Sequence, residues 1–204
     1  MELQDALVQV SEIRRQMARS ETFRGYRSVP AAISAAIAVG TAALQPAIVA
    51  DPAASPERYL KLWVSAAFVS ILVTAGEMVV RCRRSASPLT TRMALLMVEQ
   101  FLPCTIVGGA VTLVLSLGES EGLWMLPGLW GLFFSLGLFA SARLLPRPIF
   151  AVALYYLACG LAALAFAHGD RAFSPWTMAT TFGGGQLMTA IILYFTLERP
   201  HGNA

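Results

Sequence analysis

The stretch from Met93 to Leu117 constrains the fold most, because 25 residues carrying one charged side chain, Glu99, can cross a bilayer as a helix. At about 1.5 Å of rise per residue, such a helix is longer than the roughly 30 Å hydrocarbon core of a bilayer. A carboxylate at the centre of a membrane helix costs about 2.5 to 3.5 kcal/mol of insertion free energy. We therefore expect Glu99 to face other helices, a partner or a water-filled cavity.

Long apolar runs of this kind, each with at most one charged residue, account for most of the chain. Only 13% of the 204 residues are charged, against roughly 25% in soluble domains. Including the first stretch, the runs are residues 29–50, 62–80, 93–117, 123–142, 149–167 and 175–197. Each has about the length needed to span a bilayer. The sequence predicts an all-α polytopic integral membrane protein, with one domain of six transmembrane helices over residues 29–197.

The basic residues predict the orientation of these helices. If the N-terminus is cytoplasmic, only Arg58, Lys61 and Arg171 fall on the outer side. The inner side then holds Arg14, Arg15, Arg19, Arg24, Arg27, Arg81, Arg83, Arg84, Arg92, Arg143, Arg147 and Arg199. This bias predicts that both termini are inside, with lipid head groups rather than nucleic acid as partners of the arginines. The compact chain and its arginine-rich inner loops favour a bacterial inner membrane.

The N-terminal segment, residues 1–28, is predicted to be a cytoplasmic helix and linker. Residues 2–19 place Leu3, Leu7 and Val10 on one face at helical spacing, with charged residues elsewhere. Such an amphipathic helix either lies on the membrane surface, which its position beside a span favours, or docks onto another helix. Residues 198–204 are predicted to be a short cytoplasmic tail.

The second predicted span carries a polar stripe at spacings of four, three and four: Ser70, Thr74, Glu77 and Arg81. Glu77 precedes Arg81 by four residues, so a local ion pair is the simplest explanation of both charges. The short connection to the next span makes a shared polar pocket of Glu77 and Glu99 the alternative, and such a pair of carboxylates could carry a proton.

Three more polar residues complete the predicted intramembrane cluster. Gln100 follows Glu99 in the third span, Gln186 lies near the midplane of the last span, and Arg143 stands at the inner end of the fourth. Such a cluster could serve as a site for a ligand, a proton or a partner protein.

Small residues predict where helices approach closely. Ala32, Ala36 and Gly40 recur every fourth residue in the first span, as do Ala31 and Ala35, and form a predicted helix-packing face. Gly183, Gly184 and Gly185 interrupt the last span. Tight packing of a neighbouring helix is the commoner reason for such glycines, and the alternative is a helix that unwinds around a ligand.

Three of the four tryptophans fall near the outer ends of predicted spans, at Trp63, Trp124 and Trp176. Indole rings prefer the membrane interface. We therefore expect these three side chains to lie there.

Catalytic motifs are missing from the sequence. It contains no GxSxG, HExxH or phosphate-binding loop, and its two histidines, His168 and His201, fall on opposite sides of the predicted membrane. The three cysteines form no CxxC pair. We therefore expect no enzymatic activity, no metal and no cofactor.

Two functions remain. The first is a non-enzymatic accessory, assembly or regulatory subunit of an inner-membrane complex, which binds the bilayer and other membrane proteins or copies of itself. The alternative is a small transporter or substrate-binding membrane subunit that uses Glu99 and Glu77 for a proton, a cation or a small polar solute.

Overall fold

The computed structural model describes residues 27–85, 88–118 and 120–199, and every regular element within these ranges is a helix. The elements are α2 (Ser28–Ile48), α3 (Pro56–Ser85), α4 (Pro88–Leu117), η1 (Ser120–Met125), α5 (Leu126–Ala140), α6 (Ile149–Phe166), η2 (Gly169–Phe173), α7 (Pro175–Met178), η3 (Ala179–Gly184), α8 (Gly185–Leu193) and η4 (Tyr194–Glu198). The predicted all-α class is confirmed for these residues. The amphipathic helix predicted for residues 2–19 and the tail beyond Arg199 lie outside them.

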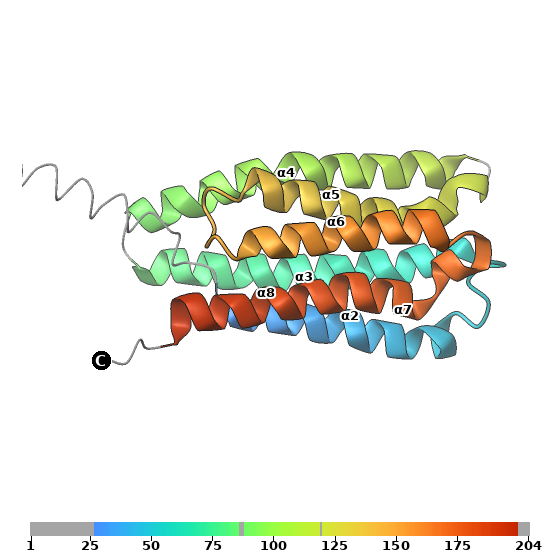
Figure 1. Ribbon diagram of the computed structural model, residues 1–204, viewed down its shortest axis with the longest axis horizontal. Coiled ribbons are helices and arrows are strands. Elements are labelled where there is room, and N and C mark those ends of the chain that lie inside the picture. The colour runs from blue at the N-terminus through green and yellow to red at the C-terminus, as the bar shows by residue number, and fades with distance from the viewer. Residues whose placement is uncertain (1–26, 86–87, 119, 200–204) are drawn as a thin grey trace, which may run out of the picture.

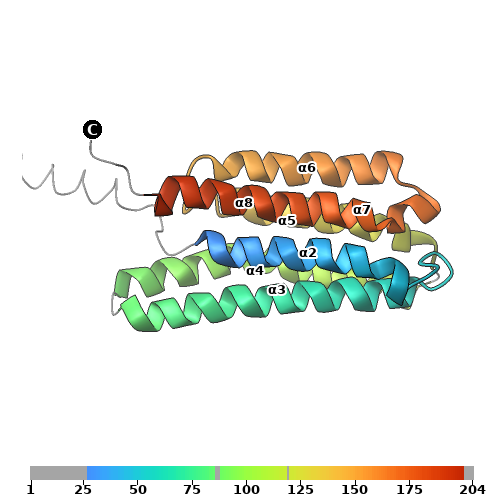
Figure 2. The ribbon, with the colours of Figure 1, turned by 90° about the horizontal axis from the view of Figure 1, so that it is seen from below.

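The helices run side by side along one axis and form a bundle (Figures 1 and 2). Helix α2 packs between α3 and α8, and α5 packs between α4 and α6. Helix α6 also contacts α8, which closes that side of the bundle. Helices α3 and α4 contact each other far less than α5 and α6 do. They therefore form the least covered side of the bundle.

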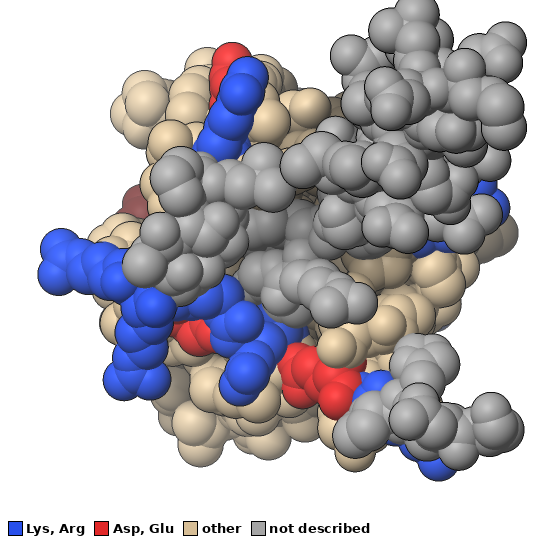
Figure 3. Space-filling view, turned by 90° about the vertical axis from the view of Figure 1, so that its left-hand side faces the viewer, with Lys and Arg blue, Asp and Glu red and all other residues tan. Residues whose placement is uncertain are grey.

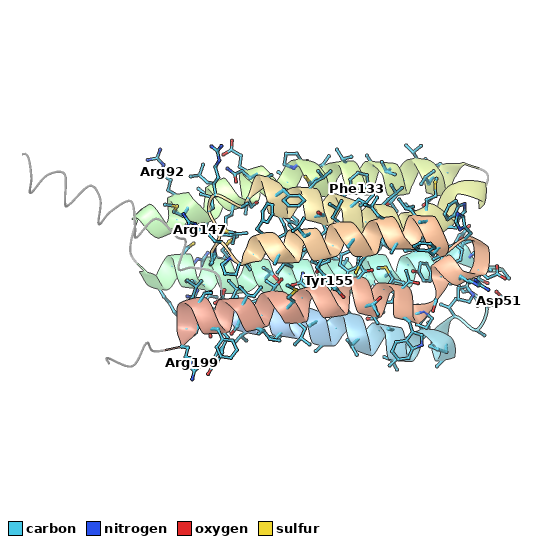
Figure 4. The ribbon with its side chains drawn as sticks, in the orientation of Figure 1. Asp51, Arg92, Phe133, Arg147, Tyr155 and Arg199 are labelled. Carbon is cyan, nitrogen blue, oxygen red and sulfur yellow. The ribbon has the colours of Figure 1, made fainter. Side chains whose placement is uncertain are left out.

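Arginines gather at one end of the bundle, which we call the arginine-rich end. Arg92, Arg147 and Arg199 lie there, and Asp51 lies at the opposite end (Figure 4). Figure 3 faces the arginine-rich end and shows several blue side chains gathered on it. The described basic residues of this end are Arg27, Arg81, Arg83, Arg84, Arg92, Arg143, Arg147 and Arg199. The opposite end has only Arg58, Lys61 and Arg171 among the described residues.

Five described helical segments are long and apolar enough to cross a membrane: Ser28–Ile48, Pro56–Arg84, Thr91–Leu117, Gly122–Ala140 and Ile149–Phe166. They indicate a multi-pass membrane protein. The sixth predicted span, residues 175–197, is helical as well, but it is not one α-helix. It consists of α7, η3, α8 and η4 in direct succession, and η3 and η4 are π-helical.

Two hydrophobic clusters form the core, one toward each end of the bundle. Tyr59 and Trp63 of α3 pack with Phe173 and with small residues of α2 at the end away from the arginines. Tyr156 of α6 and Leu193 of α8 belong to the cluster nearer the arginine-rich end. Aromatic and aliphatic side chains thus join the helices along most of the bundle.

Burial differs sharply between helices. In the most apolar 18-residue stretch of each segment, 44% of the residues are buried for Gly122–Ala140, 11% for α3 and none for α4. Exposed aliphatic side chains such as Leu95, Ile106 and Leu113 cover α4 instead. Such a surface suits contact with lipid chains or another membrane helix rather than with water.

Only one of the two predicted stripes of small residues on α2 is buried. Ala32 and Ala36 are exposed, and a Cβ atom on Gly40 would meet nothing within 4 Å. The buried stripe is instead Ala31, Ala35, Ala38 and Ala42. Both sets have small residues at nearly the same spacing, so the spacing alone could not tell which one packs against α3 and α8.

Gln45 organises the end of the bundle opposite the arginines. Its side chain is only 1% exposed. Its Nε2 donates to the Phe173 carbonyl at 2.8 Å, and its Oε1 accepts from Trp63 Nε1 at 2.9 Å. Trp63 thus packs inside the bundle, and its indole N–H has a buried partner. Trp176, which is 74% exposed, does lie on the surface of the bundle.

The three consecutive glycines of the last helical run fit close packing rather than an unwound helix. A Cβ atom on Gly183 would come within 2.8 Å of Val39 in α2. A Cβ atom on Gly184 would overlap the Tyr155 hydroxyl, and one on Gly185 would overlap the Tyr156 ring. Two neighbouring helices, α2 and α6, thus approach the backbone from different sides, and each glycine makes room for one side chain.

Candidate functional site on helices α3 and α4

The polar stripe of α3 is half-buried along its length. The Ser70 and Thr74 hydroxyls each donate to the carbonyl four residues earlier, at 2.9 Å. These bonds satisfy the hydroxyl donors within the helix itself, as is common for serine and threonine in apolar surroundings.

Glu77 and Arg81 form the ion pair that their spacing predicts. Arg81 Nη2 donates to Glu77 Oε1 at 2.6 Å, and Nε donates to the same oxygen at 3.0 Å. Both side chains are half-buried, with 23% and 30% of their surfaces exposed for Arg81 and Glu77. The charge of Glu77 is therefore balanced by a residue one turn away.

Glu99 lies elsewhere. It is exposed on the surface of α4, whereas Gln100, the next residue, is half-buried. Consecutive residues of a helix point about 100° apart, so the helix directs Gln100 toward the bundle and Glu99 away from it. Among the described residues, none forms an ion pair or a hydrogen bond with the Glu99 carboxylate. Of the surroundings expected for Glu99, packing against other helices is not observed within the described residues.

Pro103 leaves a second acceptor at the same place, the backbone carbonyl of Glu99. In a regular α-helix, the N–H of residue 103 would donate to the carbonyl of Glu99, four residues earlier. Proline has no N–H, and Pro103 lies inside α4. The backbone carbonyl and the side-chain carboxylate of Glu99 therefore share one turn that lacks its regular backbone donor.

Gln100 contributes an acceptor on the inner side of α4. Its Oε1 atom is buried and has no hydrogen-bond partner within the described part of the chain. A buried amide oxygen without a donor costs about 1 to 3 kcal/mol. This oxygen therefore lowers the stability of the described bundle, so packing within the bundle does not explain why residue 100 is a glutamine.

Gln186 and Arg143 do not join these residues in a network. Gln186 is half-buried in α8, and Arg143 is exposed just beyond α5. Neither side chain has a hydrogen bond or an ion pair with another described residue. The predicted cluster is thus divided into an ion pair on α3, an acceptor-rich turn on α4 and two separate polar side chains.

One polar contact near the arginine-rich end has no counterpart in the sequence prediction. The Glu198 carboxylate accepts from the Ser28 backbone N–H at 2.7 Å and from the Ser28 hydroxyl at 2.9 Å. An acidic group at a helix N-terminus satisfies free N–H groups and the helix dipole. Glu198 thus ties the start of α2 to the end of η4, two segments 170 residues apart in the chain.

The arrangement limits the chemistry that these groups can perform. In residues 27–85, 88–118 and 120–199, no three His, Cys, Asp or Glu side chains are grouped so that they could hold a metal ion. Glu77 is paired on its own helix and Glu99 is exposed on another, so the geometry does not bring the two carboxylates into one pocket. What the site offers is hydrogen-bond acceptors on an apolar helix surface.

Comparison with known proteins found no match to the chain among family models, curated proteins or solved structures.

Proposed function

We propose that the chain is a six-span protein of a bacterial inner membrane, with both termini on the cytoplasmic side. The sixth span is the run from Pro175 to Glu198, which is helical over 24 residues and therefore roughly 35 Å long. The arginine-rich end is the cytoplasmic end, since basic residues favour that side.

This topology can be tested by labelling engineered thiols in intact cells. Ala53→Cys lies in the exposed connection between α2 and α3, and Arg147→Cys lies in the exposed connection between α5 and α6. A membrane-impermeant maleimide should label residue 53 in intact cells and residue 147 only after the membrane is opened. Labelling of both residues from one side would contradict the proposed topology.

Within this membrane, the protein acts as a non-enzymatic accessory, assembly or regulatory subunit of a larger complex. The observation that supports this function is the surface of α3 and α4, which other described helices leave largely uncovered. Lipid alone would cover its aliphatic side chains well, but lipid chains offer nothing to the Glu99 carboxylate. A partner subunit would cover both.

Purification from native membranes in a mild detergent tests this function. We expect a defined membrane protein to accompany the tagged chain in a fixed ratio through two successive columns. A matched preparation of an unrelated six-span protein controls for general membrane contaminants. Recovery of the chain with lipid alone, at all detergent strengths that keep it folded, would contradict the function.

A second candidate is a small transporter or a substrate-binding membrane subunit. The half-buried stripe of α3 and the unpaired Gln100 oxygen support it, because both face the bundle from neighbouring helices. Since Glu99 is exposed, a path through the bundle would rely on Glu77, Gln100 and Gln186. In proteoliposomes with an internal pH dye, Glu77→Gln should then abolish proton or solute flux while the fold is retained. Absence of any flux in the wild-type protein would leave only the first function.

A further inference from the structure

The exposed surface of α4 has the residue spacing of a helix-pairing seam. Most residues of α4 beyond Met97 are exposed, and one set of exposed residues recurs at alternating steps of four and three along the helix: Leu95, Glu99, Leu102, Ile106, Gly109 and Leu113. This is the seven-residue repeat by which two helices pack side by side. A Cβ atom on Gly109 would meet nothing within 4 Å, so a neighbouring backbone can approach there. We call these six residues the α4 seam.

Glu99 is the one charged residue of the α4 seam. A single polar residue in such a repeat commonly fixes which helix pairs and in which register. Its carboxylate and the carbonyl that Pro103 leaves without its regular donor are both acceptors. The group that fits them must supply several N–H donors and a positive charge, which is the chemistry of a guanidinium or an ammonium group.

The depth of Glu99 points to a protein side chain as the source of that charge. Glu99 lies 18 residues from Leu117, about 27 Å along the helix, and about 10 Å inward from Arg92. In the proposed topology this is the cytoplasmic edge of the hydrocarbon core. An arginine or lysine of a partner helix reaches this depth with its long aliphatic stem in contact with apolar surface.

A second copy of this chain fits the seam poorly. Copies in one membrane have the same orientation, so a two-fold axis normal to the membrane brings a second Glu99 to the depth of the first. The described residues of the α4 seam include no basic side chain. Pairing two seams would therefore place like charges together.

We propose that the α4 seam binds one transmembrane helix of a different protein, and that this helix carries an arginine or lysine that pairs with Glu99. This inference rests on the proposed accessory function and adds the surface, the kind of partner and the residue that recognises it. Apolar residues flanking the basic side chain at the same repeat would fill the remaining positions of the seam.

Photocross-linking in native membranes locates the partner. Benzoylphenylalanine replaces Ile106, which lies in the seam two turns from Glu99 and is 60% exposed. The matched control has it in place of Leu154, an exposed residue of α6 (46%) at a similar distance from the end of its helix. We expect the Ile106 variant to form one defined adduct with another protein. The cross-linked peptide should lie in a membrane helix with an arginine or lysine at the depth of Glu99.

Charge reversal then tests whether Glu99 recognises that helix. Glu99→Lys should reduce the Ile106 adduct about tenfold or more, and Glu57→Lys, at an exposed residue near the start of α3, should leave it unchanged. Glu99→Gln provides a milder variant whose folding can be checked by its thermal midpoint, and it should also lower the yield. Combining Glu99→Arg with the opposite change at the basic residue of the partner should restore the adduct.

Several outcomes would overturn the inference. They are adducts with lipid alone, with a second copy or with residues 1–26 of the same chain, and a protein adduct that Glu99→Lys leaves unchanged. A partner that co-purifies but is cross-linked by benzoylphenylalanine in place of Leu154, and not in place of Ile106, would overturn this inference. The accessory function would still stand. Failure to recover any partner would overturn both.

Discussion

Two strongly polar residues in apolar helices, Gln45 of α2 and Glu99 of α4, are accommodated in opposite ways. Gln45 is buried, and both ends of its amide are hydrogen-bonded to other segments of the same chain. Glu99 is exposed on the bundle and has no partner among the described residues. The difference teaches that the contacts of Gln45 are complete within the chain, whereas those of Glu99 are not. This difference is the observation from which we propose a contact of α4 with another protein.

Removing the amide of Gln45 should have the largest effect on stability. Gln45→Leu keeps the volume of the side chain but leaves the Trp63 N–H and the Phe173 carbonyl without their partner. We expect the free energy of unfolding in detergent to fall by about 3 kcal/mol, since each buried orphaned group costs about 1 to 3. Denaturation followed by tryptophan fluorescence measures it. An unchanged value would mean that this end is not held by the amide.

The packing of α8 against α6 can be tested next through a glycine. Gly185→Ala introduces a Cβ that overlaps the buried Tyr156 ring, and we expect a loss of about 2 kcal/mol from overpacking. Gly40→Ala is the matched control, because its Cβ would meet nothing within 4 Å, and alanine should stabilise the helix by about 0.5 to 1 kcal/mol. Equal effects of the two substitutions on unfolding would argue against the packing described for both helices.

The hydrogen bonds between the start of α2 and the end of η4 should have a smaller effect on stability. Glu198→Ala removes both acceptors of the Ser28 N–H and hydroxyl. We expect a loss of about 1 kcal/mol, the usual cost of a missing helix cap. Hydrogen exchange of the first turn of α2 should increase at the same time. Unchanged exchange there would show that the carboxylate does not hold this helix start.

The ion pair on α3 should matter least for stability. Glu77→Gln removes a pair that is partly exposed and local to one helix, so we expect a change of no more than about 0.5 kcal/mol. The unfolding midpoint in detergent measures it, with Glu57→Gln as a control for an exposed pair on the same helix. A loss comparable to that of Gln45→Leu would show that the pair of Glu77 with Arg81 stabilises the fold far more than its partial exposure implies.

Much of the fold could be predicted from the sequence, because apolar runs of membrane length leave few alternatives. The runs 29–50 and 149–167 correspond closely to α2 and α6. The spacing of Glu77 and Arg81 also predicts their pair, since contacts four residues apart depend on one helix only.

The rotation of each helix about its axis could not be predicted. Ala31 and Ala32 begin stripes of equally small residues, and only the neighbouring helices decide which stripe is buried. The same holds for Glu99 and Gln100, because the bundle exposes Glu99 and half-buries Gln100. The buried hydrogen bond of Trp63 could not be predicted for a related reason, since its partner Gln45 comes from another helix.

The most direct test pairs Gln45→Leu with Glu99→Leu and records two quantities for each variant: the unfolding free energy of the purified chain and the amount of partner recovered from native membranes. We predict that Glu99→Leu unfolds no more easily than the wild-type protein but loses the partner. Gln45→Leu should be destabilised, and its folded fraction should still bind. If Glu99→Leu instead destabilises the isolated chain as much as Gln45→Leu does, or retains the partner in full, Glu99 does not mark a surface for another protein.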